Sequence, residues 1–215
     1  MSQFVDRRQY APATERNREP IRSVLTPYLP PAGTILEIAS GTGQHAAFLA
    51  AQLPSHTWLP SDPNPIARDS IRSWRETTAL PNLCEPLELD VMRSQWVSVV
   101  ATWQQQKPDV KGIRAIVNIN MIHISPWAAC EGLLTGAADI LSAGDVLYLY
   151  GPFKRAGEHT APSNEAFDQS LRSQNSSWGV RDLEAVQELA QKQGLTLEAV
   201  VAMPANNFSV IFKLA

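Results

Sequence analysis

The feature that most constrains the fold is a change of hydrophobic period around a glycine-containing turn near residue 40. Residues 34–39 are apolar and β-branched, and they are bounded by Gly33 and Gly41, which predicts a buried strand. From Gly43 until Pro54 the apolar residues recur at helical spacing. A strand, a glycine turn and a helix therefore follow one another, as in the first half of a βαβ unit.

Strand and helix patterns continue to alternate along the rest of the chain. Further strands are predicted at residues 56–62, 85–90, 113–119 and 145–151, and helices at residues 64–77, 96–105, 127–141 and 181–193. Residues 195–203 and 208–214 are predicted to be the two strands of a terminal hairpin. Such alternation predicts an α/β fold, with a doubly wound parallel sheet and helices on both of its faces.

Two segments fall outside this alternation. Thr14 is a candidate N-cap for a helix that ends near Leu29, so residues 1–30 are predicted to form an N-terminal covering helix. Residues 152–179 are rich in Gly, Pro, Ser and Asn and are predicted to form a functional flap, with a short helix at residues 165–172. A length of 215 residues fits a single domain over residues 1–215.

The composition narrows the classes of partner and location. A net charge of −3 provides no general positive field, so we expect a small-molecule substrate and no nucleic acid. No membrane span or secretory signal is found in the sequence, and a cytoplasmic location is expected. Cys84 and Cys130 lie far apart and are interpreted as buried, unreactive thiols, and no residues have metal-ligand spacing. The oligomeric state stays open.

Carboxylates stand at or near the ends of the first three predicted strands. Asp62 ends the second strand, 19 residues after Gly43, where a doubly wound sheet places the acid that binds ribose hydroxyls. Asp90 ends the third strand, and Glu37 lies within the first. The amides at the start of the helix after the turn add hydrogen-bond donors and a positive dipole end. These features together predict a nucleoside site at the carboxyl ends of the strands.

A pyrophosphate dinucleotide is the competing ligand. Its fingerprint would need glycines at positions 39, 41 and 44, whereas this chain has Ala39, Gly41 and Gln44. Acids against the crevice would also repel phosphates. A nucleoside with a positively charged substituent suits the site better.

The turn resembles the first motif of class I S-adenosylmethionine-dependent methyltransferases, an acid followed by small residues with glycines at the positions of Gly41 and Gly43. Ala39 departs from the usual first glycine of that motif. A longer resemblance, to a methyltransferase-like domain-of-unknown-function 938 family, rests on residues 8–17, 36–46, 118–124, 150–154 and 204–207. It implies a Rossmann-like sheet of seven strands in the order 3-2-1-4-5-7-6, with the last strand antiparallel.

The resemblance also implies a cofactor, S-adenosylmethionine, whose product is S-adenosylhomocysteine, and the residues that bind it. These are Glu37, Ala39, Ser40, Gly41, Gly43, Asp62, Asp90, Val91, Asn118, Arg16 and Asn17. Asp62 would hold the ribose, Asp90 with Val91 the adenine, and the turn with Glu37 the methionine part. Asn118 would face the sulfonium. Either Arg16 or Arg18 would pair with the methionine carboxylate.

The function predicted in this way is methyl transfer to a small or medium polar acceptor. The predicted catalytic residues are His123, Tyr10 and Asn120, and His123 would orient the acceptor or take its proton if the acceptor is a hydroxyl. Two alternatives stay open: a cofactor-binding protein that acts through a partner without catalysis, and a nicotinamide-dependent reductase.

Overall fold

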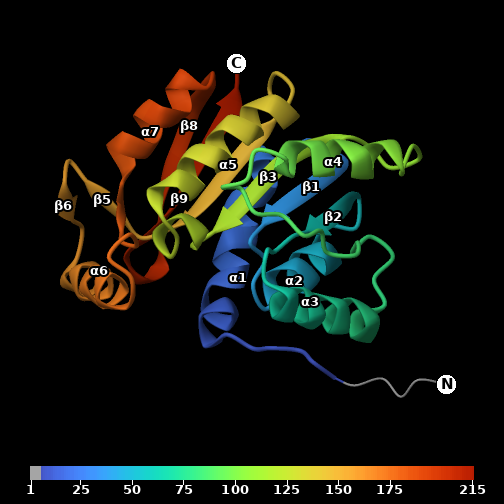
Figure 1. Cartoon of the computed structure of the whole chain (residues 1–215), viewed down its shortest axis with the longest axis horizontal. Helices are drawn as coiled ribbons and strands as arrows, with labels where there is room; N and C mark the ends of the chain where they lie inside the picture. Colours follow the sequence, from blue (N-terminus) through green and yellow to red (C-terminus); the bar gives the residue numbers. More distant parts are fainter. Residues whose placement is uncertain (1–5) are drawn as a thin grey trace.

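The computed structural model describes residues 6–215, and its main sheet has six strands in the order β2-β1-β3-β4-β9-β8 (Figure 1). Their bounds are β1 Gly33–Ile38, β2 His56–Pro60, β3 Ile113–Ile119, β4 Val146–Gly151, β8 Leu195–Met203 and β9 Asn207–Leu214. The first four strands pair in parallel, and β9 is antiparallel to both β4 and β8. The carboxyl ends of β1 to β4 therefore share one edge of the sheet.

Helices cover both faces of this sheet. They are α1 Pro12–Leu25, α2 Gln44–Gln52, α3 Pro65–Thr78, α4 Trp96–Gln105, α5 Trp127–Ile140, α6 Pro162–Gln174 and α7 Leu183–Lys192. Alternate strand residues point to opposite faces, so Leu36 and Ile38 pack in one core cluster with α4, α5 and α7. Ile35 and Trp58 pack in a second cluster with α1 and α2. This confirms the predicted doubly wound, Rossmann-like α/β fold. No helix within residues 6–215 has the length and apolar character needed to cross a membrane.

The main sheet has six strands where seven were predicted, because residues 85–90 do not form a strand. The chain here still runs beside β2: isolated parallel bridges join Leu83, just before this segment, to Trp58 of β2, and Leu87 to Ser61, directly after β2. Pro86 has no amide hydrogen and cannot donate to a ladder at that position. The remaining strand order agrees with the order that the resemblance implies.

The N-terminal helix starts earlier than predicted. It begins at Pro12 after an N-cap at Ala11, and Thr14 is buried inside it instead of capping it. Proline suits the first helical position because its missing amide hydrogen would be unpaired there anyway. A 3₁₀ turn, η1 at Thr26–Tyr28, follows the helix. Of the predicted covering segment at residues 1–30, residues 1–5 lie outside the described part of the chain.

The predicted flap at residues 152–179 contains more regular structure than its composition suggests. β5 Phe153–Arg155, β6 Glu158–His159 and β7 Arg181–Asp182 form a second, three-stranded sheet, which lies with α6 at the left of Figure 1. Because residues 181 and 182 pair with β5, α7 begins two residues later than predicted. Asp168 on α6 is buried and accepts a hydrogen bond of 2.7 Å from the amide of Val180. The segment therefore has a buried anchor.

Both cysteines in the structure are free thiols. Cys130 is buried on α5, and burial raises its pKa to about 12. Cys84 is half-buried, and burial raises its pKa as well. Because the thiolate is the reactive form, both are poor nucleophiles.

Candidate cofactor and acceptor site

The turn between β1 and α2 depends on left-handed backbone conformations. Gly41 and Gly43 have φ values of 54° and 81°, and Ala39 has 57°. A Cβ atom on Gly43 would lie 2.9 Å from Cγ1 of Ile71 on α3, so this position needs glycine for space as well as for its φ. Ala39 adopts the conformation that suits the glycine of the methyltransferase motif, although it carries a side chain.

Asp62, directly after β2, is bonded to this turn. Its Oδ2 accepts the Gly41 amide at 2.9 Å, and its Oδ1 accepts the Asn64 amide at 2.8 Å. Burial raises the pKa of Asp62, and these two amide bonds act against that effect. A carboxylate oxygen can accept two hydrogen bonds, so each oxygen of Asp62 keeps capacity for a ligand hydroxyl.

Glu37 lies beneath the turn, on the strand face that packs against α2. Its buried carboxylate accepts a 2.8 Å hydrogen bond from the indole Nε1 of Trp58. Burial raises the pKa of Glu37 to about 7, and the nearby Asp62 contributes in the same direction, while the bond from Trp58 lowers it. The backbone carbonyl of Glu37 accepts the hydroxyl of Ser61 at 2.7 Å. Glu37 therefore contacts the elements that support the turn.

A small cavity of about 90 Å³ opens between the turn and the segment after residue 88. It is lined by Ile38, Ala39, Pro63, Leu89, Asp90, Val91, Met92, Met121, Ser125 and Ala129. Asp90 is its single acid. Oδ1 of Asp90 accepts the Met92 amide at 3.0 Å, and its side chain is 25% exposed. The structure thus brings Ala39, Asp90 and Val91 to one mostly apolar slot with a carboxylate at its edge, which suits a flat base with an exocyclic amine.

Asn118 is the second-to-last residue of β3 and lies beside the turn. It is 1% exposed, and its Nδ2 donates to the carbonyl of Ile38 at 3.0 Å. Its Oδ1 is buried and has no hydrogen-bond partner within residues 6–215. A buried acceptor without a partner carries a free-energy cost that a donating or positively charged ligand group would relieve.

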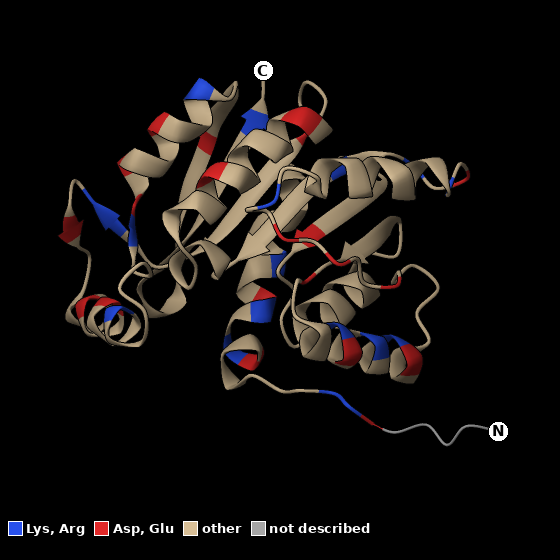
Figure 2. Ribbon diagram, viewed as in Figure 1, with Lys and Arg blue, Asp and Glu red and all other residues tan. Residues whose placement is uncertain are grey.

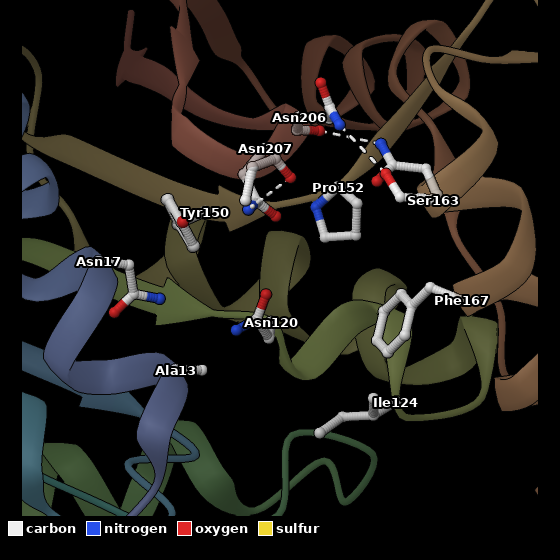
Figure 3. A pocket seen from close by; sticks show the side chains of 12 residues that line it. Ala13, Asn17, Asn120, Ile124, Tyr150, Pro152, Ser163, Phe167, Asn206 and Asn207 are labelled. Carbon is white, nitrogen blue, oxygen red and sulfur yellow. Dashed lines mark hydrogen bonds between the residues drawn. The ribbon is translucent and has the colours of Figure 1, made fainter.

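A second cavity, of about 470 Å³, lies where α1, the end of β4, α6 and the β8–β9 turn come together. Its lining residues are Ala13, Asn17, Asn120, Ile124, Tyr150, Pro152, Ser163, Asn164, Phe167, Ala205, Asn206 and Asn207. In Figure 3, Asn17 and Tyr150 lie across the cavity from Ser163 and Phe167. Of the predicted site residues, Asn17 and Asn120 reach this cavity. Its volume falls within the range of about 300 to 1,000 Å³ typical of small-molecule sites.

His123 belongs to the 3₁₀ turn η2 at Met121–His123 and is completely buried. Its Nδ1 accepts the amide of Arg181 at 3.3 Å, so the neutral ring carries its proton on Nε2, which has no partner within residues 6–215. The ring packs edge-on against Phe153 at 4.9 Å and also against Gly151, where a Cβ would lie 2.5 Å from Nε2. Burial lowers the pKa of His123 to about 3. The structure places this residue behind the end of β4, outside the lining of the 470 Å³ cavity.

Of the predicted site residues in the N-terminal segment, Asn17 lines a cavity, whereas Tyr10 does not. Tyr10 is 61% exposed and packs edge-on against Trp74 of α3 at 5.2 Å, away from both cavities. Asn17 is buried, and its Oδ1 accepts Nε2 of His45 at 2.8 Å. Burial lowers the pKa of His45 to about 4, so that ring is neutral.

The two arginine alternatives differ in their contacts. Arg18 pairs with Glu15 at 2.7 Å and lies over the ring of Phe48 at 4.9 Å. Arg16 is exposed, and in the described part of the chain it makes no ion pair. Arg16 is therefore the arginine with a guanidinium available to a ligand.

Gln44 explains why the third glycine of a dinucleotide fingerprint is missing. Its side chain is buried, its Oε1 accepts the amide of Ala11, and its Nε2 donates to Glu15 at 3.2 Å. A glycine at this position could not join α2 to the segment that leads into α1.

Sequence reasoning missed much of the wall of the larger cavity. Ser163, Asn164 and Phe167 come from α6, and Ala205 and Asn206 from the 3₁₀ turn η3 at Pro204–Asn206. Two sequence signals covered parts of this wall. Residues 152–179 were predicted to form a functional flap, and the Pro-Ala-Asn-Asn segment at residues 204–207 carried part of the family resemblance without a role.

The strand order, the antiparallel β9 and the glycine turn whose Gly41 amide is bonded to Asp62 define a class I methyltransferase-like α/β protein. Within that class, the chain belongs to the family described as "Protein of unknown function (DUF938)", whose model matches residues 8–214.

Solved structures of methyltransferases share the fold. An O-methyltransferase family protein from Burkholderia thailandensis has a TM-score of 0.75 at 15% identity, over 94% of this chain and 57% of that one. The mitomycin 7-O-methyltransferase MmcR has a TM-score of 0.73 at 16% identity, over 94% and 54% of the two chains. Human N-acetylserotonin methyltransferase, solved in complex with SAM, has a TM-score of 0.72 at 10% identity, over 94% and 52%. The chain thus spans little more than half the length of these proteins.

Proposed function

We propose that this protein transfers a methyl group from S-adenosylmethionine to a small or medium polar acceptor. The observation that carries the proposal is the cluster around the β1–α2 turn, where Asp62 holds the Gly41 amide and Asn118 presents an unpartnered buried oxygen. The adjoining slot is mostly apolar and has the Asp90 carboxylate in its lining, a polarity that suits an adenine.

The residues present fit this cofactor. Asp62 has acceptor capacity for two ribose hydroxyls, and Oδ1 of Asn118 is available to the positively charged end of the methionine part. Arg16 would pair with the methionine carboxylate. When bound, the cofactor supplies an activated methyl group: the acceptor's lone pair forms a bond to the methyl carbon, and the carbon–sulfur electrons remain on sulfur as a neutral thioether.

The protein's own contribution is orientation of the acceptor. Holding reactants in line is worth roughly 7 to 11 kcal/mol in favourable cases. Among the three predicted catalytic residues, we assign this positioning role to Asn120, because it lines the 470 Å³ cavity. A proton from a hydroxyl acceptor would leave to water. The catalytic roles of His123 and Tyr10 stay predictions.

Calorimetric titration with S-adenosylhomocysteine tests the cofactor half of the proposal. Asp62→Ala should weaken binding at least tenfold, because each hydrogen bond to a charged group contributes about 1.5 to 3 kcal/mol. Asp69→Ala on α3 is the matched control, since Asp69 pairs with Arg72 at the surface. Asp62→Asn keeps one of the two acceptor oxygens, and circular dichroism of each variant checks that a loss does not come from unfolding. Equal affinity in all variants would remove Asp62 from the site, and no binding by the parental chain would overturn the proposal.

A further inference from the structure

The cavity beside Asn120 is uncharged. None of its twelve lining residues carries a charged side chain, and five of them are asparagines. A third cavity, separate from the 90 Å³ one but also lined by Asp90, is in contrast charged: Glu88, Asp90 and Arg93 are among its lining residues. Tyr150 and Phe167 add ring surface to the larger cavity (Figure 3).

The asparagines of this cavity have two different roles. Nδ2 of Asn164 donates to the carbonyl of Asn206 at 2.9 Å, and Nδ2 of Asn206 donates to Oγ of Ser163 at 3.1 Å, so they join the β8–β9 turn to α6. The side-chain amide of Asn120 makes no hydrogen bond with residues 6–215. Its donor and its acceptor are both available to a molecule in the cavity.

The backbone of the wall is held in an unfavourable conformation. Six non-glycine residues in the described chain have positive φ values, and three of them, Asn120, Ala205 and Asn206, line this cavity. Asparagine tolerates the left-handed region, but alanine has no polar side chain to compensate for it. Strained non-glycine residues cluster at ligand sites, where the shape of the wall is needed.

From these observations we infer that the acceptor is an uncharged small molecule that carries hydroxyl or amide groups and a flat apolar part, bound between Asn120 and Phe167. The inference rests on the proposed function and names its substrate class. Amides provide donors and acceptors without a counter-ion, so a charged acceptor group would lose its hydration without gaining an ion pair. Several charges on α1 and α3, whose charged positions are coloured in Figure 2, are paired locally: Glu15–Arg18, Glu19–Arg22 and Asp69–Arg72.

The test separates acceptors by charge before the reaction. A deproteinised small-molecule extract of the expression host is divided by ion exchange at pH 7 into neutral, anionic and cationic fractions. Each fraction is incubated with the full chain and methyl-tritiated S-adenosylmethionine, and products are resolved from the cofactor by liquid chromatography. We expect enzyme-dependent label in the neutral fraction, since a neutral hydroxyl that loses its proton on methylation gives a neutral product. Label mainly in a charged fraction, or in none of the three, would overturn the inference.

Titration with S-adenosylhomocysteine distinguishes a failure of the inference about the acceptor from a failure of the proposed function. Normal binding together with label in a charged fraction would refute the neutral acceptor alone, whereas absent binding would refute the proposed function.

A charge variant adds a test within the cavity. Asn120→Asp keeps the size and the left-handed conformation of Asn120 but adds a negative charge, and it should lower the ratio of neutral to cationic label at least about tenfold. Asn175→Asp, at the exposed end of α6, adds the same charge outside the cavity and keeps the oxygen that accepts the Ser177 amide. Because Asn206→Asp changes an exposed residue, it serves as a second cavity variant if Asn120→Asp folds poorly. Both the cavity variant and the control should bind S-adenosylhomocysteine normally. If the ratio of neutral to cationic label is the same in the two variants, the inference is overturned.

Discussion

Replacing Glu37 by glutamine should make the protein more stable at alkaline pH and leave its stability almost unchanged in acid. The carboxyl of Glu37 is 1% exposed, and burial raises its pKa to about 7 from an ordinary value of 4.5. Glutamine has nearly the same size, and its carbonyl oxygen can accept the hydrogen bond that Trp58 donates to Glu37. The substitution therefore removes the titration with little change in packing.

The size of the effect follows from the two pKa values. Below pH 4.5 the folded and unfolded chains both hold the proton, and the stabilisation from this group is fully present. As the pH rises from 4.5 to about 7, the unfolded chain releases the proton first, and the folded state loses stability relative to it. One pKa unit is worth about 1.36 kcal/mol, so the parental chain should lose roughly 2 to 3 kcal/mol relative to Glu37→Gln between pH 5 and pH 8.

Urea denaturation at pH 5, 6, 7 and 8 measures this difference directly. Glu76→Gln removes an exposed carboxylate from α3 and is the control, for which we expect parallel curves. If the gap in unfolding free energy between the parental chain and Glu37→Gln is the same at pH 5 and pH 8, the reasoning about burial is wrong.

Three further predictions concern the turn, the buried histidine and the flap. Gly43→Ala should lower the free energy of unfolding by about 2 kcal/mol or more, because its Cβ would meet Ile71 in addition to the φ of 81°. Gly144 has a φ of 84° and open space around it, so Gly144→Ala should lower the free energy of unfolding by only about 1 kcal/mol. If urea denaturation gives equal losses for the two variants, the clash with Ile71 is excluded. The imidazole NMR signals of His123 should not titrate between pH 5 and pH 8, since burial lowers its pKa to about 3, and a midpoint near 6.5 would contradict this. Asp168→Ala removes the acceptor of the Val180 amide and should speed amide hydrogen exchange in residues 162–180 at least about tenfold, whereas unchanged exchange would mean that other contacts hold the flap.

Much of the cofactor side of the candidate site could be predicted from local patterns. The turn after β1 follows from a change of period and two glycines, and Asp62 follows from its distance along the chain. Parallel strands place their carboxyl ends at one edge, so residues that end successive strands come together without any detail of packing.

The edge of the sheet and the flap could not be predicted in this way. Residues 85–90 have a strand-like composition, but pairing depends on a ladder with β2 that Pro86 interrupts. The strands β5, β6 and β7 have only two or three residues each, too few for a period of two to be recognised.

Most of the wall of the 470 Å³ cavity was decided by the tertiary structure, although Asn17 and Asn120 were predicted from the sequence. His123 follows a strand end, as predicted, but Phe153 and the flap cover its ring and exclude it from the cavity. Asn120 directly follows β3, and Asn206 directly precedes β9. They lie 86 positions apart and line one cavity because only β4 separates these two strands in the sheet. The sequence by itself determined the units that are local in the chain, a strand, its turn and its helix, since their signals lie within a few residues. Burial and cavity shape depend on contacts between segments that are distant in the chain, and the hydrophobic periodicity of each segment does not predict those contacts.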